Sequence, residues 1–90
     1  MKILKYRLHP GMNKIPVAAD LVAKLRYIND QDGKLFGWFE VATDTDLHLE
    51  AHEYEVYLAM TGETLPDGYN YVCSHQQHQA GGYFLVHAFD

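Results

Sequence analysis

The chain has 90 residues, which is enough for one compact domain and too few for two. Hydrophobic residues make up 48% and charged residues 21%, and this composition excludes the polar, aromatic-poor class of disordered proteins. The single cysteine excludes an internal disulfide and therefore predicts a reducing cytoplasm. No apolar run approaches the roughly 20 residues of a membrane span, so no membrane partner is predicted.

The formal net charge is −5, but the charges are unevenly distributed. All seven lysine and arginine residues lie between Lys2 and Lys34, whereas nine of the twelve acidic residues follow Lys34. We predict that the two halves interleave in one sheet and that their charges pair across strands. Duplex nucleic acid is not expected as a partner, because it draws its affinity from clustered cations.

Alternation of apolar and polar residues predicts β-strands in the first half of the chain. Residues 4–8 alternate in this way, and the His9-Pro10-Gly11 sequence ends the strand. A second strand is predicted from residue 22, and residues 29–33 contain an Asp-Gly pair that favours a tight hairpin turn. Residues 34–41 form the returning strand, and their nearly continuous apolar character predicts a central position in the sheet.

Residues 17–28 also fit a second interpretation. Val17, Leu21, Leu25 and Ile28 fall at near-helical spacing behind Pro16, a residue that helices tolerate at their first position. The strand is the preferred interpretation, because the Asp-Gly turn needs two antiparallel arms. The helix stays open as the alternative.

The second half of the chain continues the β pattern. Residues 53–60 alternate with their carboxylates outward, and residues 61–68 contain a proline and two glycines typical of a loop. Two further strands, residues 69–74 and 83–89, are predicted to pair as a hairpin. Residues 1–90 therefore predict a single, mainly β domain: a small antiparallel β-sandwich or partly open barrel of about six strands.

Several short motifs along the chain resemble a family of short, uncharacterised tailed-phage proteins. The family begins with K-Y-x-L and continues with a proline, a tryptophan strand, a G-x-G loop and a terminal G-x-F-V-W-H-V-F strand. The matching residues here are Lys5-Tyr6-Arg7-Leu8, Ile15-Pro16, Gly37-Trp38-Phe39, Thr61-Gly62-Glu63 with Leu65-Pro66, and the terminal run Gly81-Gly82-Tyr83-Phe84-Leu85-Val86-His87-Ala88-Phe89.

The resemblance covers nearly the whole chain and departs from the family in two places. Leu85-Val86 precede the histidine where the family tends to have Val-Trp, and Glu63 separates Gly62 from the usual second glycine. The resemblance implies a phage or prophage origin, with action in the host cytoplasm, and a mainly β fold. It supplies no catalytic residue set.

The histidines and the lone cysteine are the candidate metal ligands and catalytic groups of the chain. His48 and His52 flank Glu50 in the order H-x-E-x-H, which differs from the H-E-x-x-H and H-x-x-E-H orders of zinc proteases. Cys73 with His75 or His87 would be the only nucleophile and base pair, and no orienting third group accompanies it. We predict no catalytic residues, no metal site, no cofactor and no enzymatic activity.

A binding role is the preferred prediction. Glu53, Glu55 and Tyr57 share one face of their strand, and acidic groups beside tyrosine suit a protein interface because complementary charge speeds the encounter with a basic partner. The predicted function is therefore a phage-encoded protein that occupies and inhibits a host protein or protein complex, as an anti-defence protein would.

Two other functions are kept as alternatives. The first is a sponge that sequesters a nucleotide immune signal between protomers, in which Trp38 stacks on the base and Lys24 or Arg26 holds the phosphate. The second is a small structural or assembly component of the virion. A homodimer is expected, because a small sheet leaves edges that must be paired or protected.

Overall fold

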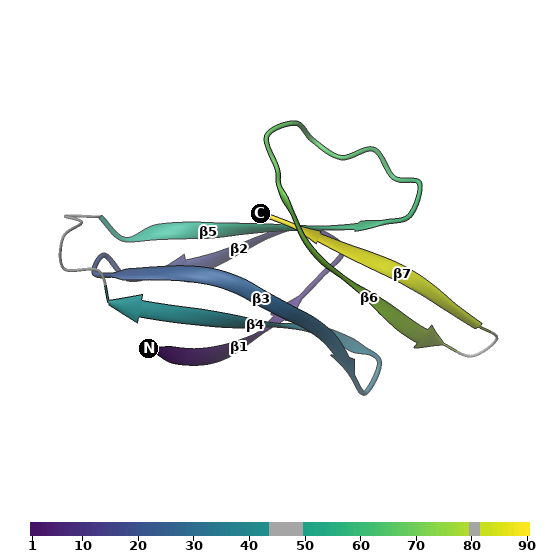
Figure 1. Cartoon of the computed structure of the whole chain (residues 1–90), viewed down its shortest axis with the longest axis horizontal. Helices are drawn as coiled ribbons and strands as arrows, with labels where there is room; N and C mark the ends of the chain where they lie inside the picture. The colour runs from purple at the N-terminus through teal and green to yellow at the C-terminus, as the bar shows by residue number, and fades with distance from the viewer. Residues whose placement is uncertain (44–49, 80–81) are drawn as a thin grey trace.

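The computed structural model describes residues 1–43, 50–79 and 82–90 of the chain, and all the regular elements in those ranges are β-strands (Figure 1). The predicted mainly β fold is confirmed, with seven described strands where about six were expected. In chain order they are β1 (Lys2–Leu8), β2 (Gly11–Val17), β3 (Leu21–Gln31), β4 (Lys34–Thr43), β5 (His52–Met60), β6 (Tyr71–Gln79) and β7 (Gly82–Phe89).

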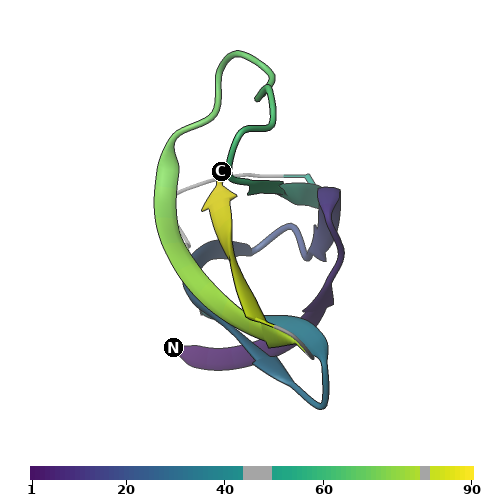
Figure 2. The same cartoon turned by 90° about the vertical axis from the view of Figure 1, so that its right-hand side faces the viewer.

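The strands form two antiparallel sheets, with strand orders β1-β4-β3 and β2-β5-β7-β6. The predicted central position of residues 34–41 is confirmed, because β4 pairs with β1 on one side and with β3 on the other. Viewed along the long axis, the two sheets curve around a common interior (Figure 2). The described strands do not close into a barrel, which agrees with the predicted small antiparallel β-sandwich or partly open barrel.

Two of the predicted hairpins are present. Asp32 and Gly33 link β3 to β4 with φ angles of 53° and 76°, the left-handed backbone that a two-residue hairpin turn requires. Strands β6 and β7 pair antiparallel from Tyr71 opposite Phe89 to Gln79 opposite Gly82.

The helical alternative for residues 17–28 is wrong, and a β-bulge explains why the spacing imitates a helix. The register between β3 and β4 shifts between Leu25 and Tyr27, so one extra residue, Arg26, interrupts the alternation. Leu25 and Ile28 are consequently both 1% exposed although they are three residues apart. An apolar spacing of three therefore arises here inside a strand.

Strand β2 was not predicted, because two of its residues break the usual strand pattern. Pro16 lies opposite Glu53 and is exposed, and Asn13 occupies a core-facing position at 7% exposure. The Asn13 amide nitrogen donates to the carbonyl oxygens of His9, Gly11 and Val56 at 2.8, 3.1 and 3.2 Å, and its oxygen accepts the His9 N–H at 2.8 Å. Asn13 thus replaces backbone pairing at the corner where the chain passes from one sheet to the other.

The core lies between the two sheets and takes residues from both. The largest side chains below 2% exposure are Phe39, Leu8, Leu25, Ile28, Leu58, Val56 and Val86. The Phe39 ring meets Tyr6 and Tyr54 edge-to-face, with centroid separations of 5.6 and 5.9 Å. These contacts join β1, β4 and β5 across the interior.

In the described part of the chain, the predicted pairing of charges between the two halves is present for two of the seven cations, although the strands form two sheets and not one. Lys24 meets Asp90 at 2.9 Å, and Arg26 meets Glu40 at 2.6 Å. A third pair, His75 with Asp30 at 2.5 Å, links β6 to β3 where the two sheets approach each other without backbone pairing. Within the described ranges, no helix is long and apolar enough to cross a membrane.

Candidate functional site

The alternation of β5 places its carboxylates and its apolar side chains on opposite faces. Glu53 and Glu55 are exposed, whereas Val56 and Leu58 are 0% and 1% exposed in the core. Lys14 lies opposite Glu55 on β2, yet no ion pair joins them in the part of the chain that the structure describes. The two carboxylates predicted to bind a partner therefore point to solvent on the outer side of the second sheet.

Two surface hollows flank this pair of carboxylates. The first, of about 610 Å³, lies towards β2 and is lined by Lys14, Pro16, Val17, Ala18, Ala51, His52, Glu53 and Glu55. The second, of about 460 Å³, lies towards the loop before β6 and is lined by Glu53, Tyr54, Glu55, Asp67, Gly68, Tyr69 and Asp90. We call the second one the acidic hollow, because four of its seven lining residues carry a carboxylate.

Tyr57 shares the outer face of β5 with Glu53 and Glu55, but it is less exposed than they are because Tyr69 lies against it. The two rings have their centroids 5.9 Å apart, and Tyr57 is partly buried. The Tyr69 hydroxyl donates to Glu55 at 3.0 Å, and partial loss of water together with this bond to a carboxylate raises the pKa of Tyr69 above its ordinary value. The Tyr69 hydroxyl therefore holds the Glu55 carboxylate by a hydrogen bond on the outer face of the sheet.

Asp90 closes the acidic hollow at the end of β7. Its backbone exchanges two hydrogen bonds with Asn70, at 2.8 and 2.9 Å, which extend the pairing of β6 and β7 by one step. Its carboxylate accepts hydrogen bonds from the Tyr54 hydroxyl and from Lys24. Burial opposes ionisation of Asp90, but these two donors outweigh it and hold the pKa of the carboxyl below its ordinary value.

Asp90→Asn is expected to lower the free energy of unfolding at pH 7 by about 1 kcal/mol, because it replaces the charged acceptor of two hydrogen bonds. The folded pKa lies below the unfolded pKa, so this contribution is complete above roughly pH 4 and is lost as the pH falls through the folded value. Urea unfolding at a series of acidic pH values measures it. The fall in the free energy of unfolding at acidic pH should be smaller in Asp90→Asn than in wild type, and it should be unchanged in Asp67→Asn, where the side chain is exposed. An equal pH dependence in the two variants contradicts the prediction.

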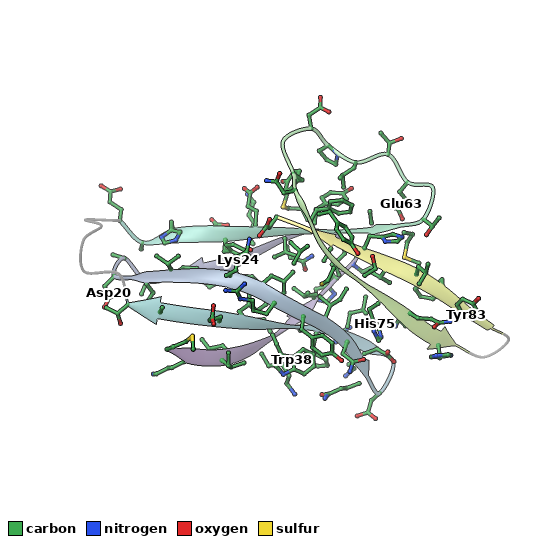
Figure 3. The ribbon with its side chains drawn as sticks, viewed as in Figure 1. Asp20, Lys24, Trp38, Glu63, His75 and Tyr83 are labelled. Atoms are coloured by element: carbon green, nitrogen blue, oxygen red, sulfur yellow. The ribbon has the colours of Figure 1, made fainter. Side chains whose placement is uncertain are left out.

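Lys24, Arg26 and Trp38, the residues of the alternative nucleotide site, lie on the outer face of the first sheet. Trp38 is directly opposite Tyr27, and their ring centroids are 5.4 Å apart. Lys24 and Arg26 are both held in ion pairs, with Asp90 and Glu40 respectively. Figure 3 shows Lys24 on the side of β3 nearer β5 and Trp38 on the other side, so these two residues do not converge on one point.

The candidate metal and thiol groups are placed as follows. His48 lies outside the described residues, and His52 contacts the Glu50 carbonyl oxygen at 3.2 Å. Cys73 is partly buried, and burial raises the pKa of its thiol, which disfavours the reactive thiolate. His75, two residues along, is engaged with Asp30. Among the residues that the structure describes, no three His, Cys, Asp or Glu side chains converge as metal ligands do.

A row of polar side chains crosses the outer face of β6 and β7. Ser74 Oγ lies 2.7 Å from His87 Nδ1 and 2.7 Å from the Tyr71 hydroxyl, and His87 Nε2 lies 2.8 Å from Thr61 Oγ1. The sequence predicted the hairpin but not its register, and the register places Ser74 opposite His87. Thr61 takes the place where a carboxylate would orient a catalytic histidine. These contacts connect Thr61, just after β5, to the hairpin of β6 and β7.

Comparisons with known proteins complete the description of the site. No curated protein and no solved structure matches the chain. A family model described as a domain of unknown function matches residues 1–90. The chain therefore belongs to the family of this domain of unknown function, DUF7352.

Proposed function

We propose that the protein is a non-enzymatic binding protein whose acidic hollow engages a basic surface of a host macromolecule and inhibits it. The observation that carries the proposal is that Glu53 and Glu55 line two hollows, one of which Asp67 and Asp90 also line. Lysine or arginine side chains of a partner fit such a surface, because complementary charge steers association and selects the partner.

The rigidity of the acidic hollow supports binding. Tyr69 packs on Tyr57 and donates to Glu55, while Tyr54 and Lys24 hold Asp90. The side chains that face the partner are therefore ordered before binding, which reduces the entropy lost on association. Tyrosine also supplies a large apolar contact area with few rotatable bonds.

The resemblance to tailed-phage proteins supports a narrower form of the proposal. In this form the chain is phage-encoded, acts in the host cytoplasm and blocks a component of host defence. A homodimer is part of the same proposal. Self-association into an ordered array without any partner would instead favour a role in the virion.

Charge reversal tests the acidic hollow. A Glu53→Lys, Glu55→Lys double variant is expected to weaken capture of the partner from host lysate by at least tenfold, because it places cations against a basic surface. The matched control is Glu63→Lys at an exposed position of the loop outside the hollow (Figure 3). It makes the same kind of charge change and should leave capture unchanged.

The captured protein must then be purified and titrated with the wild-type chain. The affinity of the captured protein for the chain should fall as the salt concentration rises, and the chain should inhibit its activity. The Tyr57→Ala variant of the chain should bind more weakly, because the Tyr69 ring no longer packs on Tyr57. The proposal fails if capture survives the double charge reversal or if Glu63→Lys abolishes it equally.

A further inference from the structure

The outer face of the first sheet differs in chemistry from the acidic hollow. Strands β1, β3 and β4 contain six of the seven cations, Lys2, Lys5, Arg7, Lys24, Arg26 and Lys34, and only two carboxylates, Asp30 and Glu40. Both carboxylates are engaged, Asp30 with His75 and Glu40 with Arg26. Most of the cations therefore lie on the first sheet, whereas Glu53 and Glu55 lie on the second.

Three aromatic rings lie in the middle of this cationic surface. Tyr27, on β3, is 51% exposed, and it stands directly opposite Trp38 on β4. Phe36 lies two residues before Trp38 in β4, so the two side chains are on the same face of the strand. We call Tyr27, Phe36 and Trp38, with the neighbouring cations Lys5 and Arg7, the aromatic face.

The β-bulge of β3 creates this arrangement. Regular alternation would turn Tyr27 inward after the outward Arg26, but the extra residue keeps both side chains exposed. Arg26 forms an ion pair with Glu40, and the Tyr27 ring contacts the Trp38 ring. The bulge thus widens the aromatic surface across two strands instead of leaving a single ring on β4.

The cations of β1 border the rings on the other side. Lys5 lies opposite Trp38 and Arg7 lies opposite Phe36. The Lys5 ammonium is 4.8 Å from the centre of the Phe36 ring and 6.0 Å from that of Trp38, where the negative face of a ring attracts a cation. Lys5 Nζ donates to Gln31 Oε1 at 3.1 Å, but neither Lys5 nor Arg7 has a carboxylate partner among the described residues, so neither charge is neutralised.

We propose that the aromatic face binds single-stranded nucleic acid. Unpaired bases stack on the rings of Tyr27, Trp38 and Phe36, and Lys5 and Arg7 contact the phosphates beside them. Side chains on one face of a strand repeat about every 6.8 Å, so Phe36 and Trp38 form two neighbouring stacking positions. A duplex does not fit, because its bases are already stacked on one another and offer no free ring face.

The proposed site shares Trp38 with the nucleotide site expected from the sequence. The cations that contact the phosphates are different. Lys24 and Arg26 already hold Asp90 and Glu40, so Lys5 and Arg7 take the phosphates in their place. The site lies on the other sheet from the Glu53 and Glu55 carboxylates of the acidic hollow.

The chain contains a single tryptophan, which makes Trp38 a direct reporter of the site. Titration with oligothymidine or oligouridine is expected to quench its fluorescence, and the anisotropy of a labelled strand should rise in parallel. A duplex of the same length should bind much more weakly. Comparison of the two single strands shows whether the ribose hydroxyl contributes, and a thymidine mononucleotide shows whether one base is enough.

Substitutions separate stacking from general charge. Tyr27→Ala is expected to weaken binding about tenfold, whereas Tyr27→Phe retains the ring and should bind within about twofold of wild type. Tyr83→Ala is the matched control, because Tyr83 is 64% exposed but lies at the start of β7, away from Trp38 (Figure 3). Lys5→Ala should reduce the salt dependence of binding by about 0.7 in logarithmic slope, and Lys14→Ala on β2 should not.

The proposal is overturned by unquenched Trp38 fluorescence in low salt, by equal affinity for the duplex, or by equal losses in Tyr27→Ala and Tyr83→Ala. It is also overturned if light scattering shows a dimer that Tyr27→Ala dissociates, because a second copy of the chain then occupies the aromatic face. Circular dichroism of each variant confirms the fold, and the retained ring of Tyr27→Phe keeps the comparison valid if Tyr27→Ala unfolds.

Discussion

Phe39→Ala is expected to lower the free energy of unfolding by about 3–5 kcal/mol, because it removes a fully buried ring and leaves a cavity. Small domains are stable by only about 5–15 kcal/mol in total, so the substitution should remove a large share of the stability. The loss exceeds that of an ordinary buried side chain because Phe39 also meets Tyr6 and Tyr54 edge-to-face.

Urea unfolding followed by circular dichroism measures this loss. Phe36→Ala is the matched control, since it removes the same side chain from the outer face of the same strand, where Phe36 is only partly buried. Its cost should be less than half that of Phe39→Ala. Equal costs for the two variants would show that the core does not lie between the sheets at β4.

Asn13→Asp is expected to destabilise the protein by about 3 kcal/mol at pH 7 although the two side chains have nearly the same shape. The Asn13 amide donates to three carbonyl oxygens, and a carboxylate would place negative charge against the same three acceptors. The free energy of unfolding should therefore fall mainly because of charge and not because of lost packing.

The pH dependence distinguishes these causes. The fold raises the pKa of the introduced carboxyl above its unfolded value of roughly 3.9, so the variant is most stable below that pH and loses stability as the pH rises through the folded pKa. Asn70→Asp makes the same change at an exposed site and should cost little at any pH. A deficit in Asn13→Asp that does not change with pH would contradict the assigned hydrogen bonds.

Several features of the fold could be predicted because they depend on neighbouring residues alone. Alternation along β1, β4 and β5 sorts core from surface, and the Asp32-Gly33 pair places a hairpin turn. The carboxylates Glu53 and Glu55 were expected on the surface for the same reason. Each of these rests on the local geometry of an extended backbone, which is the same in any sheet.

Other features depend on residues that are distant in the sequence. The burial of Asn13 makes sense only beside the carbonyl oxygen of Val56, and Tyr57 loses its exposure only because the loop before β6 brings Tyr69 over it. The same loop brings Asp67 to the hollow beside Glu53 and Glu55. Local patterns cannot predict such contacts, because they exist only once the strands have been ordered within each sheet.

The amino-acid sequence by itself determined the β class, the central strand β4 and the segregation of cations from carboxylates along the chain. Only the tertiary structure decided that most of the cations lie on the first sheet and the β5 carboxylates on the second, that a bulge at Arg26 turns Tyr27 outward beside Trp38, and that Asp90 completes the acidic hollow. The physical reason is that backbone alternation is a local property, whereas the register and order of strands depend on the packing of the whole core.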